Sequence, residues 1–345
     1  MDVRIGILTA GGDAPGLNAA VRAIGRSALS DGHEVVGIED GWAGLLGDLR
    51  VRTLDRPALA GILQEGGTLL GSVRRDLDHP AGGREQVLAS INKEFDAVVA
   101  IGGDGTLSVA EWLAQRGAPI VGVPKTLDND LAETEYCIGF DTAVSIVAEA
   151  LDRLHTTAAS HHRVLVLETM GRSTGWVAAL GGLAGGADYI VIPEFPVTMD
   201  DVVEHITRRH ASGSSFSIVV VAEGVSLTSL GGVEPLDLPT DAVGRVQWAS
   251  RSVGHFLADQ LQQRTGYDTR STVLGYLQRA GSPSAHERIY ATRLGVAAYE
   301  AVCAGAFGSV PIVRNGDVVR ASLADVTASV RAVPRDLYEL CARFF

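Results

Sequence analysis

The sequence has little of what marks secreted, membrane-spanning or nucleic-acid-binding proteins. It contains three cysteines in 345 residues, far apart and without metal-ligand spacing, which argues against a disulfide framework. No apolar stretch is long enough to cross a membrane, and residues 1–12 lack the features of a signal peptide. The formal net charge of -12 disfavours a nucleic-acid or anionic-membrane partner. These deficits predict a cytoplasmic protein with reduced thiols.

Short apolar runs are abundant instead. Runs rich in Val, Ile and Leu occur at residues 3–8, 35–38, 97–101, 120–123, 164–167, 189–192, 216–221 and 272–274. Helical patterns follow or intervene at residues 17–30, 107–116, 143–159, 174–184, 201–210, 247–264 and 285–304. Several runs are apolar on consecutive residues, as in parallel strands that helices cover on both faces. The alternation predicts an α/β protein with doubly wound, mostly parallel sheets.

Glycine clusters follow several of these runs, at the strand ends where ligands bind in open α/β sheets. Residues 9–18 read TAGGDAPGLN, a glycine turn that leads into a helix. Backbone amides and the helix dipole of such a turn can hold a phosphate. Glycine turns also simply connect strands to helices, so the turn alone favours the two interpretations equally.

A second glycine segment, IGGDGTL at residues 101–107, ends the 97–101 run. Gly102 and Gly103 let the backbone approach a polyphosphate, and the Asp104 carboxylate can hold Mg²⁺ through water. Alternatively, the segment is a tight turn in which Asp104 caps the next helix. The GGDGT pattern also occurs in NAD and lipid kinases, so it indicates a phosphoryl-donor loop rather than one enzyme.

An acidic segment, VPKTLDND at residues 123–130, follows the 120–123 run. It places two carboxylates, an amide and a lysine within six residues. One aspartate can serve as the general base for an attacking hydroxyl, while the lysine neutralises phosphate charge. The alternative is an Asx-rich turn. Its position, one strand-helix unit after GGDGT, favours the catalytic interpretation.

Together, the motifs resemble the blocks of the phosphofructokinase family. The blocks appear in family order between residue 10 and about residue 293, as GGDAPGLNAAVR, GGTLLGSVR, GGDGT, PKTLDND, GFDTA, SHHR, ETMGR, VAEG and TRSTVLGYLQR. The resemblance implies two doubly wound, mostly parallel-sheet sandwich domains with the active site in the cleft between them. It places a phosphoryl-donor domain at residues 1–138 plus about 250–300, and a sugar-phosphate domain at residues 139–249 plus 301–345.

The resemblance also implies roles for individual residues. The positions implied in catalysis are Asp128, Arg74, Arg172, Gly12 and Thr126. Those implied in donor binding are Gly11, Gly12, Arg74, Arg75, Gly102, Gly103, Gly105, Thr106 and Lys125. Those implied in binding the sugar phosphate are Thr126, Asp128, Asp130, Arg163, Met170, Gly171, Arg172, Glu223, Arg270, Tyr276 and Arg279. Asp128 would take the proton of the sugar hydroxyl, and Asp104 would be the Mg²⁺ ligand. Positioning and charge stabilisation are the main needs of phosphoryl transfer, and these residue types meet them.

Two positions bear on the identity of the donor and the acceptor. In this family an Asp at position 105 and a Lys at position 125 accompany pyrophosphate as donor, and this chain has Gly105 with Lys125. Gly105 leaves space for the α-phosphate, so we favour ATP and keep pyrophosphate as the alternative. Tyr276 stands where the family usually has His against the sugar's distal phosphate. A tyrosine adds no positive charge near neutral pH, so another sugar phosphate, such as a sedoheptulose phosphate, stays open as acceptor.

The resemblance therefore implies a 6-phosphofructokinase of glycolysis. The expected reaction is Mg²⁺-dependent transfer from ATP to the 1-hydroxyl of fructose 6-phosphate, which gives fructose 1,6-bisphosphate. A non-catalytic sugar-phosphate-binding homologue is a further alternative. It is disfavoured because Asp104, Asp128 and Arg172 are all present. The implied partners are the sugar phosphate, ATP and further copies of the chain, in a homotetramer or homodimer whose active sites are shared through Arg163 and Arg270.

Overall fold

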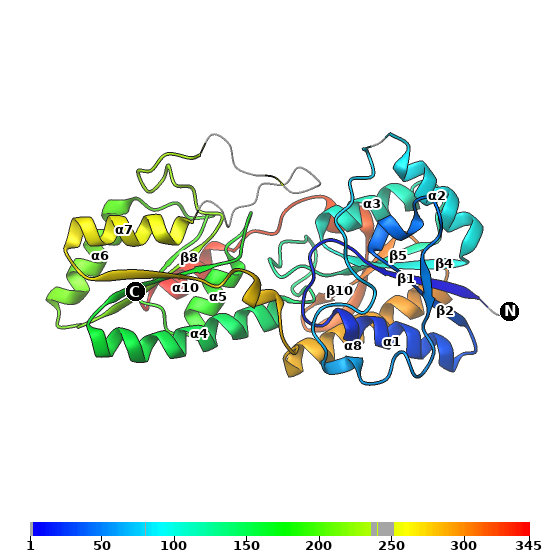
Figure 1. The fold of residues 1–345 in the computed structure, drawn as a ribbon, viewed down its shortest axis with the longest axis horizontal. Coiled ribbons are helices and arrows are strands. Elements are labelled where there is room, and N and C mark those ends of the chain that lie inside the picture. Colours follow the sequence, from blue (N-terminus) through cyan, green and yellow to red (C-terminus); the bar gives the residue numbers. More distant parts are fainter. Residues whose placement is uncertain (1–2, 80, 236–239, 241–251) are drawn as a thin grey trace. The chain divides into compact units, whose positions relative to one another are not determined.

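The computed structural model describes residues 3–79, 81–235, 240 and 252–345 (Figure 1). The chain folds into two compact units, each built from two stretches of sequence. Unit 1 comprises Met1–Asp141 and Arg279–Val330, and unit 2 comprises Thr142–Gln278 and Arg331–Phe345. Among the described residues, no helix combines the length and the apolar character needed to cross a bilayer.

Unit 1 is built on a five-stranded sheet in the order β3-β2-β1-β4-β5. Its strands are β1 (Arg4–Thr9), β2 (Glu34–Ile38), β3 (Val51–Thr53), β4 (Ala97–Gly102) and β5 (Ile120–Pro124). All neighbours are parallel except β3, which pairs antiparallel with β2 at the edge. Every residue of β4 and β5 is buried, as expected for parallel strands with helices on both faces.

The helices of unit 1 cover both faces of this sheet. They are α1 (Leu17–Ser30), α2 (Gly83–Glu94), α3 (Asp104–Ala114), α8 (Ala285–Cys303) and the short α9 (Leu323–Thr327). α1 and α8 lie on one face, and α2 and α3 lie on the other (Figure 1). α1 and α8 approach closely because Gly295 has no side chain: an added Cβ would lie 2.8 Å from the Ala20 carbonyl oxygen.

A hairpin extends unit 1 beside β5. Its strands, β10 (Ser309–Arg314) and β11 (Asp317–Ser322), pair antiparallel across Asn315 and Gly316, whose φ angles are 52° and 77°. Two central residues with positive φ are typical of a two-residue hairpin turn. β10 packs against β5 where Gly122 leaves room, since an added Cβ would lie 3.0 Å from Val310 Cγ2.

Unit 2 has a four-stranded parallel sheet in the order β7-β8-β6-β9. Its strands are β6 (Val164–Thr169), β7 (Tyr189–Val191), β8 (Ser217–Ala222) and β9 (Thr269–Val273). Its helices are α4 (Phe140–His161), α5 (Trp176–Ala184), α6 (Met199–Ala211), α7 (Val253–Thr265) and α10 (Arg335–Ala342). α4 and α5 lie on one face of the sheet, and α6 and α7 lie on the other (Figure 1).

The fold class predicted from the sequence is confirmed, with all eight predicted strands present within a few residues. The helix expected at 247–264 is observed as α7, and its first five expected residues, 247–251, lie outside the described residues.

The division into units differs from the expected one in two stretches. Residues 252–278 belong to unit 2 because β9 pairs with β6, and residues 301–330 belong to unit 1 because β10 packs against β5. Both stretches are assigned by contacts with strands more than a hundred residues earlier in the sequence, which composition and local pattern do not reveal.

Candidate active site

In unit 1, three loops follow the carboxyl ends of adjacent strands. The glycine turn (residues 9–16) follows β1, the GGDGT loop (residues 101–107) follows β4, and the acidic loop (residues 124–139) follows β5. Because β1, β4 and β5 are neighbouring parallel strands, the three loops meet at one edge of the sheet. This is the edge at which open α/β sheets bind their ligands.

The glycine turn is shaped by close neighbours on two sides. Gly11 has a φ of 88°, which side chains rarely adopt, and its carbonyl accepts a hydrogen bond from the Ser72 hydroxyl at 2.7 Å. A Cβ added at Gly12 would lie 2.7 Å from Arg279 Nη1, which donates to the Asp13 carbonyl at 2.9 Å. The positive φ therefore favours glycine at position 11, and the Arg279 side chain lies directly against position 12.

Lys125 is almost completely buried, at 3% exposure, and its ammonium group reaches the glycine turn. Nζ donates to the carbonyl oxygens of Ala10 at 3.2 Å and of Gly12 at 2.5 Å. Burial, followed by the positive charges of Arg279 and Arg74, lowers the pKa of Lys125 to about 7. The lysine thus holds the acidic loop to the glycine turn, and Arg74 is close enough to influence it.

The GGDGT loop ends as a helix begins. Asp104 is the first residue of α3 and is exposed, while Gly103 precedes it as the N-cap. The Lys125 N–H donates to the Gly102 carbonyl at 2.9 Å, which joins this loop to the acidic loop. A side chain at Gly102 would collide with Thr106, which is buried. The backbone N–H groups of the first turn of α3 remain at the edge, where they suit an anion.

The acidic loop places three polar side chains at the same edge. The Asp128 N–H donates to the Thr126 hydroxyl at 3.2 Å. Burial, and next the charge of Asp128, raise the pKa of Asp130 to about 6, and Asp104 contributes in the same direction. Asp130 Oδ1 is buried and has no hydrogen-bond partner within the part of the chain that the structure describes. A buried carboxyl whose pKa is raised by two neighbouring carboxylates is in an environment that a cation would stabilise.

These carboxylates are better suited to Mg²⁺ than to a metal ion whose ligands are all protein side chains. Within the described ranges, no three His, Cys, Asp or Glu side chains converge as a ready-made ligand set. Mg²⁺ typically keeps several waters and binds through one or two carboxylates together with substrate phosphates. Asp104, with Asp128 and Asp130 nearby, supplies ligands of that kind.

Asn129 shapes the acidic loop, although the sequence analysis gave it no role. It adopts a φ of 51° and is buried. Its side-chain oxygen accepts from the Cys137 N–H at 3.0 Å, and its amide donates to the Glu135 carbonyl at 3.1 Å. Both bonds join Asn129, the neighbour of Asp128, to the later part of the same loop. The DND sequence was the available signal, since Asn tolerates left-handed backbone and bonds nearby main chain.

In unit 2, the residues after β6 and β8 come together at the carboxyl edge of the sheet. Gly224 N–H donates to the Gly171 carbonyl at 3.0 Å, and a side chain at Gly224 would collide with the Arg172 carbonyl. Met170, Gly171, Arg172 and Glu223 are thereby brought into one neighbourhood. Gln278, which the sequence analysis missed within LQR, is fully buried and accepts from the Met170 N–H at 3.2 Å.

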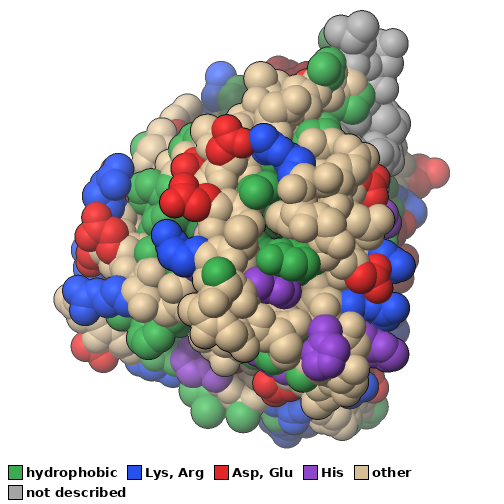
Figure 2. Space-filling view, turned by 90° about the vertical axis from the view of Figure 1, so that its left-hand side faces the viewer, with side chains coloured by type: hydrophobic (Ala, Val, Ile, Leu, Met, Phe, Trp, Pro, Cys, Tyr) green, Lys and Arg blue, Asp and Glu red, His purple; other side chains and the backbone are tan. Residues whose placement is uncertain are grey.

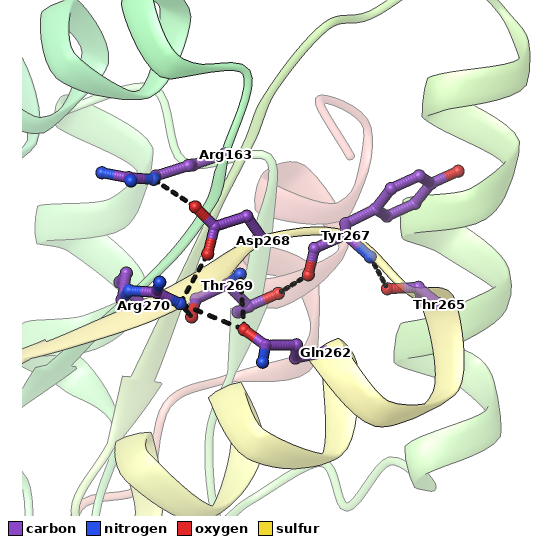
Figure 3. Close-up of polar contacts among 7 residues, drawn as sticks. All are labelled: Arg163, Gln262, Thr265, Tyr267, Asp268, Thr269 and Arg270. Atoms are coloured by element: carbon purple, nitrogen blue, oxygen red, sulfur yellow. Dashed lines mark hydrogen bonds and ion pairs between the residues drawn. The ribbon is translucent and has the colours of Figure 1, made fainter.

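Arg163 and Arg270 lie at the opposite, amino-terminal edge of the unit 2 sheet (Figure 3). Both contact Asp268: Arg163 Nε donates to Oδ2 at 2.6 Å, and Arg270 Nη1 lies 2.5 Å from Oδ1. Arg270 Nη1 also donates to Gln262 Oε1 at 3.1 Å. The six residues of β6 separate this pair from Met170, a distance of about 20 Å at about 3.3 Å per residue.

The surface of unit 2 mixes charges of both signs. Figure 2 shows the end of unit 2 that lies at the left of Figure 1, where basic and acidic side chains lie next to each other. The ion pairs of Arg163 and Arg270 with Asp268, and of Arg209 with Asp188 at 2.7 Å, follow the same pattern. Each arginine of the predicted phosphate pair therefore has an acidic neighbour.

Two predicted residues lie apart from these groups. Tyr276 is 80% exposed on the 3₁₀ helix Gly275–Arg279. Arg75 is exposed and lines a small cavity of about 100 Å³ together with Leu46 and Gln86. Unit 1 thus gathers most of the predicted donor and catalytic positions, namely Gly11, Gly12, Arg74, Gly102, Gly103, Asp104, Gly105, Thr106, Lys125, Thr126, Asp128 and Asp130.

Known proteins resemble this chain over nearly its whole length. An ATP-dependent 6-phosphofructokinase from Chloroflexus aggregans is 47% identical over 350 residues, which cover 99% of this chain and 96% of the relative. A pyrophosphate–fructose 6-phosphate 1-phosphotransferase from Amycolatopsis methanolica is also 47% identical, over 347 residues that cover 99% of this chain and 100% of the relative.

Solved structures show the same fold. Phosphofructokinase from Saccharomyces cerevisiae superposes with a TM-score of 0.79 at 31% identity, over 95% of this chain and 45% of the yeast chain. This chain therefore spans less than half the length of that protein. The sequence model described as "Phosphofructokinase" matches residues 4–302. With this match and with the glycine turn, the GGDGT loop and the acidic loop at one sheet edge, the chain belongs to the phosphofructokinase family.

Proposed function

We propose that this protein is a Mg²⁺-dependent 6-phosphofructokinase that transfers a phosphoryl group from ATP to the 1-hydroxyl of fructose 6-phosphate. The observation that carries the proposal is the meeting of three loops at one sheet edge of unit 1. There the charges of Asp128 and Asp104 raise the pKa of Asp130, beside a buried lysine and a glycine turn. An anion-binding turn next to a cluster of carboxylates suits a polyphosphate donor and a proton acceptor.

Asp128 is the proposed general base. Its carboxylate would accept the proton of the sugar hydroxyl as that oxygen attacks the terminal phosphorus in line with the departing group. The Thr126 hydroxyl accepts the Asp128 N–H, so it helps to orient the base. Arg74, whose charge reaches Lys125, and Arg172 would counter the charge that develops on the transferring group.

The donor would lie on the glycine turn and the first turn of α3, with its phosphates toward Asp104. Mg²⁺ bound there would neutralise part of the negative charge of the donor phosphates. Gly105 adds no side chain at this position, which leaves room for the α-phosphate of ATP. Gly11 and Gly12 let the main chain approach the donor directly.

The sugar phosphate would contact Met170, Gly171, Arg172 and Glu223 at the carboxyl edge of the unit 2 sheet. Arg163 and Arg270 cannot serve the same sugar from within one chain, because about 20 Å of β6 separates them from Met170. We therefore infer that a second copy of the chain supplies these arginines, in a homodimer or homotetramer with shared sites. The cytoplasmic location and the position of Arg279 on the sugar phosphate stay predictions.

Pyrophosphate is the second candidate donor. Lys125 supports it, and one of the relatives at 47% identity is named for pyrophosphate. Tyr276 likewise keeps a different sugar phosphate open as acceptor, because it adds no charge at the position where the family usually has His.

The deciding experiment is the initial rate with Mg²⁺ and fructose 6-phosphate, with either ATP or pyrophosphate as donor. Turnover with ATP and not with pyrophosphate is expected. Turnover with pyrophosphate alone would show that pyrophosphate is the donor, and the proposed role of Asp128 and the fold assignment would be unaffected. If neither donor is used with fructose 6-phosphate or with other ketose phosphates, the catalytic proposal is wrong and a binding-only homologue takes its place.

A further inference from the structure

Glu287 is a fully buried acidic residue with no part in the proposed reaction. It lies in the first turn of α8 at 0% exposure, and its N–H donates to the Ser284 hydroxyl at 3.0 Å. A buried carboxyl is costly unless hydrogen bonds satisfy it. Its Oε1 accepts from the Tyr136 hydroxyl and from the Gly139 N–H, the latter at 2.8 Å. Both donors belong to the acidic loop.

This carboxyl lies where the acidic loop meets the glycine turn. A Cβ added at Gly16 would lie 2.9 Å from Glu287 Cγ and 2.9 Å from Ile138 Cγ2. A Cβ added at Gly139 would lie 2.5 Å from the Cβ of Ala14. The end of the glycine turn thus packs directly on both Glu287 and the end of the acidic loop.

Hydrogen bonds within the acidic loop connect this contact to Asp128. The Ile138 N–H donates to the Pro124 carbonyl at 3.0 Å, and Asn129 bonds the main chain of Glu135 and Cys137. These hydrogen bonds tie the end of the loop to its acidic part, so we expect a displacement of one to displace the other. The glycine turn is held to the other end of the loop by the buried lysine.

We propose that Glu287 is a positioning residue that sets the distance between the glycine turn and Asp128. This inference rests on the proposed function, in which the glycine turn holds the donor and Asp128 takes the proton. Oε1 accepts both of these bonds, so the carboxyl ties the end of the acidic loop to α8. Phosphoryl transfer is sensitive to such spacing, since a displacement of about 1 Å can cost about a hundredfold in rate.

The proposal predicts different effects for two substitutions of Glu287 that are similar in size. Glu287→Gln keeps an amide oxygen that can accept both bonds, whereas Glu287→Leu fills the space and leaves the Tyr136 hydroxyl and the Gly139 N–H unsatisfied. Tyr136→Phe removes one of the two bonds and keeps the ring. Glu300→Leu, at an exposed position of the same helix, is the matched control.

We expect Glu287→Leu to lower kcat by about thirtyfold or more and to raise the donor KM, while the sugar-phosphate KM changes by less than about threefold. Tyr136→Phe should show a smaller change in the same direction. Glu287→Gln and Glu300→Leu should stay within about threefold of the original protein. If Glu287→Leu lowers only the melting temperature, with kcat and donor KM per folded molecule unchanged, the positioning role is wrong. Equal damage from Gln and Leu would also overturn it.

Hydrogen–deuterium exchange tests the contact without relying on activity. Glu287→Leu should accelerate exchange in the glycine turn and in the acidic loop, and Glu287→Gln should not. Unchanged protection of either segment in Glu287→Leu refutes the inference. If the original protein transfers no phosphoryl group while this exchange pattern is found, the proposed function fails and the coupling of the two segments stands.

Discussion

Lys125 should lose its proton near pH 7, well below the pKa of 10.5 of an ordinary lysine. The residue is 3% exposed, and its Nζ has two carbonyl partners in the glycine turn. Burial is the largest cause of its lowered pKa, and the positive charges of Arg279 and Arg74 add to it. A neutral amine still has the two N–H groups that these carbonyls need, so both hydrogen bonds survive deprotonation.

The shift has a magnitude and a sign. Lowering the pKa from 10.5 to about 7 corresponds to about 5 kcal/mol against protonation, at about 1.4 kcal/mol per pKa unit. Between these two values the unfolded chain holds a proton that the folded chain has released. The free energy of unfolding therefore rises with pH in this window, by up to about 1.4 kcal/mol per pH unit. Below about pH 7 this lysine adds no pH dependence, because both states are protonated.

The assay is a pH titration of ¹³C-labelled lysine by NMR. The sequence contains two lysines, so the spectrum has one internal reference: Lys93, whose pKa is raised by its hydrogen bond to Glu94. One signal should titrate near pH 7 and disappear in Lys125→Met, and the other should titrate above 10.5. The melting temperature of the original protein should rise relative to that of Lys125→Met between pH 7 and 9. Two signals that both titrate above pH 10 would refute the reasoning.

Three further outcomes follow from the site. Gly12→Ala should reduce kcat/KM by about tenfold or more, because its Cβ would lie 2.7 Å from Arg279 Nη1; steady-state rates at unchanged melting temperature check this. Asn129→Ala should destabilise unit 1 by about 2 kcal/mol through two lost buried hydrogen bonds, measured by urea unfolding. Mixing inactive Asp128→Ala with inactive Arg163→Ala should restore part of the activity if copies share sites. No recovery after subunit exchange contradicts the shared site.

The sheet of each unit could be predicted because its central strands carry their own signal. β4 is buried along its whole length and carries no polar side chain, and β6 is apolar from Val164 to Leu167. α1 was predicted at its observed bounds, Leu17–Ser30. Continuous apolar runs followed by glycine suffice for parallel strands with helical connections. Strands and helices of this kind are determined by residues close together in the sequence, so their positions can be predicted from local patterns.

The hairpin β10–β11 was missed although its turn carries a signal. Asn315–Gly316 is the pair that a two-residue turn with positive φ favours, and it lies between two short apolar runs. The assignment of this hairpin to unit 1 had no such signal, because it depends on β10 packing against β5. Pairing between distant segments sets the unit boundaries, and a single sequence does not display it.

The candidate site was predicted in its positions but not in its contacts. The three loops were found because glycine and acidic residues follow predicted strands. That Lys125 points back to the carbonyls of the glycine turn, and that Glu287 holds the acidic loop, could not be inferred. Both are long polar side chains that bridge segments at least 110 residues apart. The sequence around each of them does not indicate which distant residue it contacts.

The contacts of Lys125 also change how its presence bears on the donor. As a sequence feature, Lys125 favours pyrophosphate and Gly105 favours ATP. In the structure its Nζ is directed to two backbone carbonyls, so its role in shaping the glycine turn is compatible with either donor. Relatives named for ATP and for pyrophosphate are equally similar at 47% identity, so overall similarity does not separate them. Gly105 is therefore the residue that separates the two donors. At the start of α3 it adds no carboxylate to those of Asp104, Asp128 and Asp130, and ATP remains the favoured donor.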